Sequence, residues 1–251
     1  ILFMKENKCL INVCFTSDQL HKYDIKNSIV VVIDILRATS VISTAFHYGI
    51  NSVKVVDSIE EAIIHKQNKD YICAGERNAL PVDELEYGNS PFQYMNNKIK
   101  GKKLIITTTN GTNAIKISKN AKQVISASYL NIRACSEYLL TQKHNIIFLC
   151  SGWKGFYNLE DSIFAGEISE LVLKSKKFTH NCDSVRSCIY LNNLCGGDNF
   201  TFLKNSSHRK RLKNYNMEKD TIFCLKPTLK SEIVPILLED TLYNLEDINK
   251  I

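Results

Sequence analysis

Short apolar runs alternate with helix-like stretches along most of this 251-residue chain. The runs are rich in Val, Ile and Phe, as is typical of buried strands. They lie at residues 10–15, 29–34, 53–56, 71–74, 103–108, 123–127, 145–150 and 221–225. Between them we expect helices at about 38–48, 58–67, 111–119, 131–141, 161–175 and 183–194. This alternation predicts an α/β fold of three α/β/α layers, with a central sheet that is largely parallel or mixed.

The chain has no Pro- or Gly-rich linker and no sharp change of composition, so we expect one domain over residues 1–251. No apolar run approaches the roughly 20 residues of a membrane span, and the first residues lack the order of a signal peptide. The nine cysteines are irregularly spaced, as buried thiols in a reducing compartment usually are. We therefore expect a cytoplasmic protein without a membrane partner. An assembly of identical chains is left open.

Much of the net charge of +6 comes from one basic run, residues 204–219. Its simplest interpretation is a solvated helix face. Nucleic-acid binding would need aromatic or motif support around such a run, and only Tyr215 is near. We expect no nucleic-acid partner. A binding module that uses this run is still the alternative from a different functional class, and it predicts strongly salt-dependent binding.

Ligands of open α/β sheets bind beyond the carboxyl ends of the strands, so the loops that follow the strands indicate function. Four of these loops combine carboxylates with arginines, or glycine with hydroxyl groups. They contain Asp34 and Arg37; Glu76 and Arg77, with Asn89 and Ser90 further along; Thr108, Thr109, Asn110, Gly111 and Thr112; and Glu160 and Asp161. In a parallel sheet all four loops meet at one edge.

Several of these groups suit an anionic ligand. The turn at 108–112 opens a helix and would direct backbone N–H groups toward a phosphate. Arg37 and Arg77 can hold phosphate, sulfonate or carboxylate through two hydrogen bonds. Asn89 and Ser90 are candidate substrate-binding residues in the same region. The pattern favours phosphoryl chemistry on a small anionic phosphorylated substrate.

The carboxylates suit a metal ion. Asp34, Glu160 and Asp161 are candidate ligands for Mg²⁺, which prefers hard oxygen donors, and Glu76 is a further candidate in the catalytic group. Asp34 has two possible roles, as the nucleophile that attacks phosphorus or as a metal ligand. Structural roles are the alternative: an ion pair between Asp34 and Arg37, or acids placed to favour a helix N-terminus.

Common phosphate and hydrolase motifs are absent from the sequence. There is no G-x-x-x-x-G-K-[ST], no G-x-G-x-x-G after a strand and no G-x-S-x-G. Phosphatases that form an aspartyl-phosphate usually carry a second acid two residues after the first, and here that position is Leu36. The cluster of His180, Cys182, Cys188 and Cys195 lacks the paired spacing of a zinc site.

Four blocks carry a resemblance to a known family. VVIDILRATSVISTA, AGERNALPVDELEYGNSP, LIITTTNGTNAI and NLEDSIFAGEI occur in the order and spacing of the 2-phosphosulfolactate phosphatase family, and the C-terminal stretch from Ser206 to Pro235 is similar as well. The resemblance covers about residues 28–236. It implies an α/β/α fold and a Mg²⁺-dependent enzyme that hydrolyses 2-phospho-3-sulfolactate to 3-sulfolactate and phosphate, a step in making coenzyme M.

The chain departs from the family pattern in three loops. Asn78 and Ala79 replace glycines after the Gly-Glu-Arg motif, residues 84–87 replace a Gly-Phe, and Asn113 stands at a position that is commonly basic. These loops could touch the non-phosphate end of a substrate. A phosphatase that acts on another small phosphorylated carboxylic acid is therefore the nearest alternative.

Overall fold

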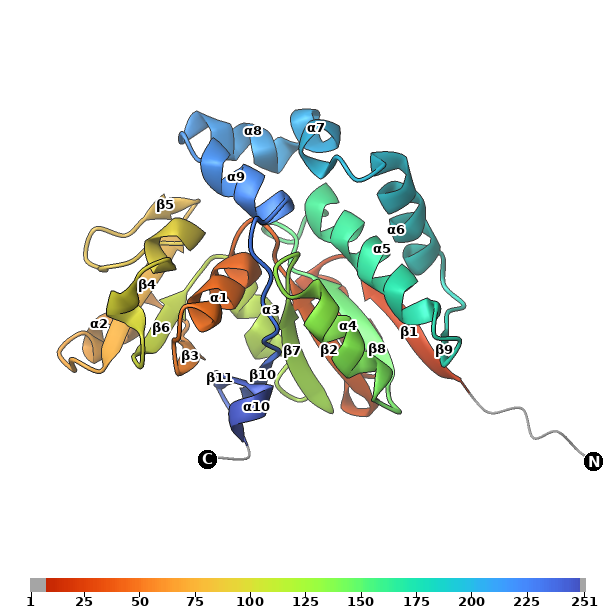
Figure 1. Cartoon of the computed structure of the whole chain (residues 1–251), viewed down its shortest axis with the longest axis horizontal. Coiled ribbons are helices and arrows are strands. Elements are labelled where there is room, and N and C mark those ends of the chain that lie inside the picture. The colour runs from red at the N-terminus through yellow and green to blue at the C-terminus, as the bar shows by residue number, and fades with distance from the viewer. Residues whose placement is uncertain (1–7, 249–251) are drawn as a thin grey trace, which may run out of the picture.

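The computed structural model describes residues 8–248, in which one mixed sheet of 11 strands lies between layers of helices (Figure 1). The strands are β1 (Cys9–Cys14), β2 (Ser28–Ile33), β3 (Ser52–Val55), β4 (Tyr71–Arg77), β5 (Leu80–Pro81), β6 (Lys103–Thr107), β7 (Gln123–Ala127), β8 (Asn145–Cys150), β9 (Phe178–Thr179), β10 (Pro235–Leu238) and β11 (Thr241–Asn244). The α-helices are α1 (Ala38–His47), α2 (Ile59–His65), α3 (Gly111–Ile117), α4 (Ile132–Leu140), α5 (Leu159–Leu173), α6 (Asp183–Cys195), α7 (Asn199–Phe202), α8 (Ser207–Asn214), α9 (Glu218–Leu225) and α10 (Leu245–Ile248).

The strands follow the order β5-β4-β6-β3-β11-β10-β7-β2-β8-β1-β9 across the sheet. Two parallel groups, β4-β6-β3 and β7-β2-β8-β1-β9, are joined by the antiparallel hairpin of β10 and β11. The hairpin pairs with β7 through Ile236 and Ile125 and with β3 through two residue pairs. Loops that follow strands of both groups, β2, β4, β6 and β8, nevertheless meet at one place, as the sequence predicts.

The core lies on both faces of the sheet. All six residues of β2 are buried, which explains its unbroken apolar sequence. Val30 and Val32 belong to one apolar cluster together with α1 and α3, whereas Val31 and Ile33 belong to another together with α4, α5 and α6. A smaller third cluster lies under α2. The predicted three-layer α/β/α architecture is confirmed.

The segment 221–225 is not a strand but the second half of α9, which corrects one prediction. Its residues Thr221, Phe223, Cys224 and Leu225 are buried while Ile222 is exposed. A short apolar run of this kind cannot be assigned to strand or helix by periodicity alone. The real C-terminal strands, β10 and β11, come later and were not expected.

Helix α1 is buried along nearly its whole length, from Ala38 to Phe46. Its hydroxyl groups bond within the helix: Ser43 Oγ donates to Thr39 O at 2.9 Å and Thr44 Oγ1 donates to Ser40 O at 2.8 Å. Polar side chains can therefore lie in the interior without unmet hydrogen bonds. The buried helix fixes the loop that precedes it, where Asp34 lies.

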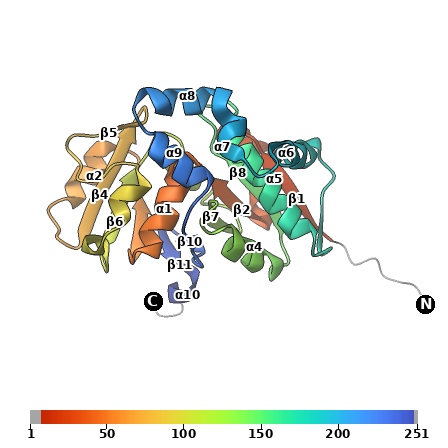
Figure 2. The same ribbon diagram turned by 45° about the horizontal axis from the view of Figure 1, so that its top comes forward.

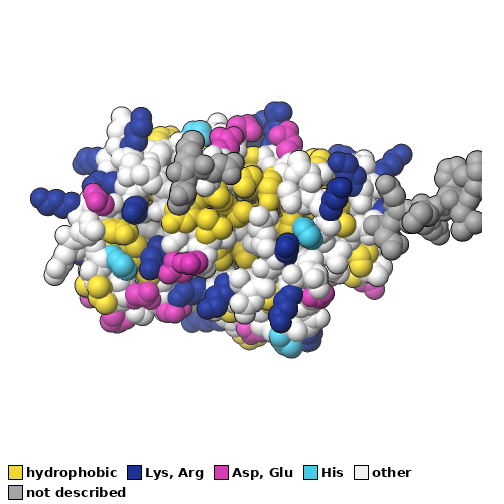
Figure 3. All heavy atoms as spheres, turned by 90° about the horizontal axis from the view of Figure 1, so that it is seen from below, with side chains coloured by type: hydrophobic (Ala, Val, Ile, Leu, Met, Phe, Trp, Pro, Cys, Tyr) yellow, Lys and Arg dark blue, Asp and Glu magenta, His cyan; other side chains and the backbone are white. Residues whose placement is uncertain are grey.

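Helices α8 and α9 lie above the sheet at its upper edge, as two views show (Figures 1 and 2). The opposite edge, seen from below, shows a central group of hydrophobic side chains with cationic and acidic side chains around it (Figure 3). Among residues 8–248 there is no helix of the length and apolar character needed to cross a bilayer.

Candidate active site

A cavity of about 360 Å³ lies where the loops after β2, β4, β6 and β8 meet α8. Six residues proposed from the sequence line it: Asp34, Arg37, Glu76, Asn89, Thr109 and Asn110. Asn78 and Ala79, from a loop where the chain departs from the family pattern, also line it. Residues that were not proposed as site residues complete the lining: Leu36, Trp153, Lys154, His208, Arg211, Leu212 and Tyr215. The parallel sheet thus brings distant loops to one place.

Asp34 is held at the cavity by the first turn of α1. Its Oδ1 accepts a hydrogen bond from Ala38 N at 3.3 Å, and its carbonyl accepts one from Thr39 N at 3.0 Å. Its Oδ2 has no hydrogen-bond partner among the residues that the structure describes. A Cβ on Gly111 would lie 2.7 Å from Oδ2, so glycine is needed for α3 to begin this close to the carboxylate. Gly111 itself does not line the cavity.

The pKa of Asp34 is raised to about 6. Burial is the main cause, because it penalises the charged carboxylate, and Glu76 and Glu160 repel the charge further. His208 and the Ala38 N–H act in the opposite direction. A carboxylate with this pKa changes its charge close to neutrality, as groups at functional sites often do.

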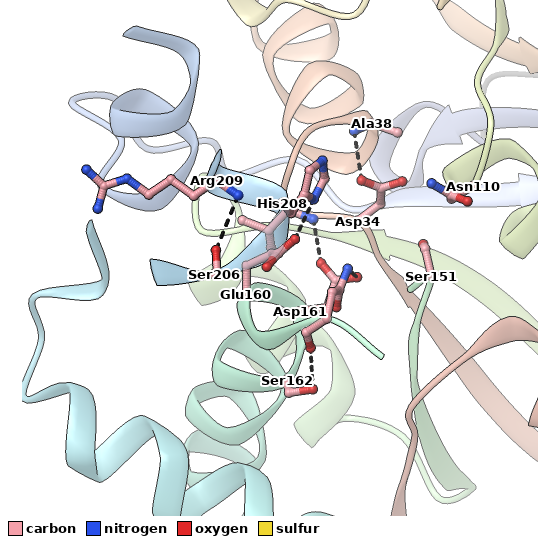
Figure 4. A network of polar contacts seen from close by, with 12 residues as sticks. Asp34, Ala38, Asn110, Ser151, Glu160, Asp161, Ser162, Ser206, His208 and Arg209 are labelled. Atoms are coloured by element: carbon pink, nitrogen blue, oxygen red, sulfur yellow. Dashed lines mark hydrogen bonds and ion pairs between the residues drawn. The ribbon is translucent and has the colours of Figure 1, made fainter. Parts of the chain in front are cut away.

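Glu160, from the first turn of α5, lies against His208 from α8. His208 Nδ1 is 2.6 Å from Glu160 Oε1, and Figure 4 shows the two side chains beside Asp34. Glu160 is 1% exposed, and its other oxygen, Oε2, is buried without a hydrogen-bond partner. Such an unpaired carboxylate oxygen is costly unless a cation or donor meets it.

Asp161 has a different environment from its neighbour. Its Oδ1 accepts from Ile35 N at 2.9 Å and its Oδ2 accepts from Asn158 Nδ2 at 2.9 Å. Burial, with repulsion from Asp34 and Glu160, raises its pKa well above the usual range. Neither Glu160 nor Asp161 lines the cavity directly. With both oxygens engaged, Asp161 anchors the loop that follows β2.

Glu76 joins two of the loops that form the cavity. Its Oε1 accepts from Thr109 N at 2.7 Å, and its Oε2 accepts from Ala79 N at 2.6 Å. Arg77 lies outside the lining residues, where it donates to Glu76 O at 2.8 Å and to Thr107 Oγ1 at 3.0 Å. These contacts fasten the ends of β4 and β6 together.

Arg37 lines the cavity, but part of its guanidinium is already engaged. Nη1 forms a buried ion pair with Asp220 of α9, and Nη2 donates to Ala79 O at 3.2 Å. Ser90 Oγ also donates to Asp220, at 2.9 Å. Ser90 lies away from the main cavity and lines a smaller one of about 200 Å³, which Arg37 and Asn89 also line. An arginine has five N–H donors, so Arg37 keeps donors for a ligand.

The turn at 108–112 divides its polar groups between structure and cavity. Thr108 and Thr112 bond each other in both directions, with each backbone N–H 3.1 Å from the other's Oγ1, and neither lines the cavity. Thr109 Oγ1 is buried and has no partner. Asn110 Oδ1 accepts from Lys154 N at 3.1 Å. Thr109 and Asn110 are therefore the members of this turn that can meet a ligand.

The basic run at 204–219 is not simply a solvated helix face, which corrects the sequence interpretation. His208, Arg211, Leu212 and Tyr215 line the cavity, and their spacing of three, four and seven residues places them on one face of α8. That periodicity was the signal available in the sequence. Arg211 also lies on Trp153, with its Cζ 3.9 Å from the ring centroid.

The carboxylate oxygens of the site meet the needs of a Mg²⁺ ion only in part. No three His, Cys, Asp or Glu side chains within residues 8–248 are placed to surround a metal by themselves. Mg²⁺ in phosphoryl-transfer sites is usually bound by one or two carboxylates together with substrate phosphate and water. Asp34 Oδ2 and Glu160 Oε2 are the carboxylate oxygens here that have no partner. These two residues fit such a site, and Asp161, with both oxygens engaged, fits it less well.

Comparison with known proteins identifies relatives over nearly the whole chain. A family model described as 2-phosphosulpholactate phosphatase matches residues 14–240. Three similar proteins carry the name "Probable 2-phosphosulfolactate phosphatase". The one from Clostridium tetani is 36% identical over 227 residues, or 90% of this chain and 96% of the relative. The one from Clostridium acetobutylicum is 34% identical over 86% of this chain and 92% of the relative. The one from Caldanaerobacter subterraneus subsp. tengcongensis is 36% identical over 88% of this chain and 92% of the relative. This chain belongs to the 2-phosphosulpholactate phosphatase family.

Proposed function

We propose that this chain is a Mg²⁺-dependent phosphatase that hydrolyses 2-phospho-3-sulfolactate to 3-sulfolactate and phosphate in the cavity described above. One observation carries the proposal: the same cavity contains the cations Lys154 and Arg211 and a carboxylate oxygen of Asp34 that has no hydrogen-bond partner among the described residues. Membership of the family supports the reaction type. A place in coenzyme M synthesis and a cytoplasmic location stay predictions from the sequence.

The charge of the cavity suits the charge of the substrate. Phosphate, carboxylate and sulfonate together carry about four negative charges, so a site for them must supply several cations. Arg37, Lys154 and Arg211 line the cavity, and His208 lies beside them. The carboxylates Asp34 and Glu76 would repel the same substrate unless a cation lay between, which supports the need for Mg²⁺.

We assign the phosphoryl group to the end of the cavity near Asp34. Thr109 Oγ1, buried and unpartnered, and the amide of Asn110 are placed to donate to its oxygens. Asp34 Oδ2 and Glu160 Oε2 would hold Mg²⁺, which supplies charge neutralisation and polarisation of the phosphoryl oxygens. In the second possible role Asp34 would itself attack phosphorus. In either role Asp34 must be ionised.

The test is phosphate release from 2-phospho-3-sulfolactate, with and without Mg²⁺, against a panel of phosphorylated acids. The proposal predicts turnover that requires Mg²⁺, is lost in EDTA and favours the sulfonated compound. Turnover of another acid would keep the chemistry and change the substrate. No phosphate release from any compound, with metal present and the protein folded, would contradict the proposal.

The second candidate is a phosphatase for another small phosphorylated acid, and one observation favours it. Asn78 and Ala79, where the chain departs from the family pattern, both line the cavity. Their backbones have positive φ of 55° and 72°, a conformation for which glycine is better suited. The departure therefore changes the surface that a substrate would meet.

The third candidate, a nucleic-acid-binding module, would use the basic run on α8. Several of its cations are engaged within the protein. Arg209 contacts Phe200 O, lies on the Phe200 ring and is 3.8 Å from Glu218, and His208 contacts Glu160. This arrangement supports a small substrate within the cavity better than a polyanion along the helix surface.

A further inference from the structure

Two cations lie against the ring of Trp153 at the wall of the cavity. The Arg211 guanidinium is stacked on the indole, with Cζ 3.9 Å from the ring centroid, and Lys154 Nζ is 5.0 Å from the same centroid. All three residues line the cavity. Arg211 comes from α8 and Trp153 from the loop after β8, so the tertiary fold, and not local sequence, creates the stack.

Neither cation donates a hydrogen bond to a carboxylate in the part of the chain that the structure describes, although Glu160 attracts the Arg211 charge from nearby. No carboxylate or carbonyl accepts a hydrogen bond from the Arg211 guanidinium or from Lys154 Nζ. Arg37, by contrast, is paired with Asp220. Two cations on one aromatic ring at a cavity wall, neither of which donates to an acceptor of the protein, have donors available for an anionic ligand.

Backbone hydrogen bonds hold the loop that carries Trp153. Trp153 N donates to Phe156 O at 2.8 Å, and Phe156 N donates back to Trp153 O at 2.9 Å. Gly152 has a φ of +66°, and a Cβ there would lie 2.5 Å from Phe156 O. Burial lowers the pKa of Arg211, as expected for a cation held partly away from water. A cation held in place before the ligand arrives loses little entropy on binding.

The loop that carries Trp153 and Lys154 is bonded to the turn at 108–112, which we assign to the phosphoryl group. Lys154 N donates to Asn110 Oδ1 at 3.1 Å, so the two regions adjoin within one cavity. A single small molecule can therefore place its phosphoryl group at Thr109 and Asn110 and a second anionic group at the cations on the Trp153 ring. The engaged guanidinium of Arg37 makes it a weaker candidate for that second anion.

We propose that Trp153, Lys154 and Arg211 form the subsite for the sulfonate group of the substrate. In this subsite Arg211 determines the preference for a sulfonated compound. This inference rests on the proposed function and deepens it. The planar guanidinium offers two parallel N–H groups to a sulfonate or carboxylate, and the indole fixes their direction. Trp153 is a positioning residue, because it acts through Arg211.

The chain contains one tryptophan, so its indole fluorescence reports on this subsite alone. We would titrate the wild type with 3-sulfolactate and, as the matched ligand, with lactate, which lacks the sulfonate. The prediction is a saturable change with 3-sulfolactate and little or none with lactate. The Arg211→Gln variant loses the guanidinium that would bind the sulfonate. Its affinity for 3-sulfolactate should therefore fall by about 10- to 100-fold.

The control is Lys213→Gln, which removes the same charge from an exposed position of the same helix. It should bind 3-sulfolactate as the wild type does. Arg211→Lys keeps the charge without the planar fork and should restore only part of the affinity. Equal loss in Arg211→Gln and Lys213→Gln would show a general charge effect and overturn the inference.

Kinetics separate this inference from the proposed function. The ratio of kcat/KM for 2-phospho-3-sulfolactate to that for 2-phospholactate should fall by about 10- to 100-fold in Arg211→Gln, and in the same direction in Trp153→Leu. An unchanged ratio overturns the subsite even when the chain is an active phosphatase. If the wild type hydrolyses neither compound, the proposed function fails, and the fluorescence titration still decides whether the sulfonate subsite exists.

Discussion

His208 Nδ1 lies 2.6 Å from Glu160 Oε1, which joins α8 to the first turn of α5 across 48 residues of sequence. Figure 4 shows this contact, and Figure 2 shows α8 lying above the sheet; His208 itself lines the cavity. The site therefore depends on segments far apart in the sequence: Asp34 and Glu76 come from the N-terminal half, whereas Glu160, Lys154 and Arg211 come from the C-terminal half.

Replacing His208 with Ala should cost both stability and activity. The change leaves both carboxylate oxygens of the buried Glu160 without a partner, and such a loss costs about 1–3 kcal/mol. Thermal unfolding and phosphate release would be measured on the same samples. His47→Ala, at an exposed position on α1, is the control and should change neither strongly. An unchanged unfolding temperature in His208→Ala would mean that the contact does not hold α8 in place.

Asp34→Asn should stop catalysis and stabilise the metal-free protein. The pKa of Asp34 in the folded state, about 6, exceeds the ordinary value of an aspartate, 3.8. Between these values the folded state binds more protons than the unfolded state, so stability falls as the pH rises through this window. Above about pH 6 the ionised carboxylate costs up to roughly 2–3 kcal/mol, which the amide avoids.

The measurement is thermal unfolding of wild type and Asp34→Asn in EDTA at pH 5 and pH 8. The variant should gain most at pH 8 and less at pH 5, while its turnover with Mg²⁺ falls by at least about 100-fold. Equal stability of the two proteins at pH 8 would contradict the raised pKa.

Gly111→Ala should impair catalysis through Asp34. The added Cβ would lie 2.5 Å from Ala38 Cβ and 2.7 Å from Asp34 Oδ2, so α3 or the carboxylate must shift. Overpacking of this kind costs about 1–3 kcal/mol of stability. Asn113→Ala serves as the control, because Asn113 is exposed on the same helix and does not line the cavity. Wild-type kcat in Gly111→Ala would show that the position of Oδ2 does not matter for the reaction.

Arg37→Met should destabilise the fold strongly. It leaves Asp220 as a buried charge without its cation, and breaking such a pair typically costs about 3–5 kcal/mol. Adding Asp220→Asn should recover part of the loss, because the unpaired charge is then removed. Urea unfolding of wild type, both single variants and the double variant gives the coupling energy. Additive losses would indicate that the ion pair carries no interaction energy of its own.

The sequence predicted the parts of the site that lie directly after strands. The apolar run of β2 is followed by Asp34, Glu76 lies near the end of β4, and the Thr109 loop follows β6, so parallel strands bring these residues together. Family resemblance added the reaction type. These predictions rest on local patterns that survive in any arrangement of the helices.

The residues that the sequence did not identify depend on long-range packing. Asp220 meets Arg37 across 183 residues, and Arg211 meets Trp153 only because α8 lies over the loop after β8. No local pattern encodes these pairs. The periodicity of α8 indicated an inward face, but the surrounding charge favoured a solvated one. Residues 221–225 were assigned to a strand because a five-residue apolar run has no clear period.

The most direct test of the account is phosphate release from 2-phospho-3-sulfolactate by wild type and Asp34→Asn, side by side, over a range of Mg²⁺ concentrations. Thermal unfolding of both proteins would first show that each is folded. The account predicts Mg²⁺-dependent turnover in the wild type and a loss of at least about 100-fold in the variant. Similar turnover in both proteins would contradict the claim that this cavity is the active site.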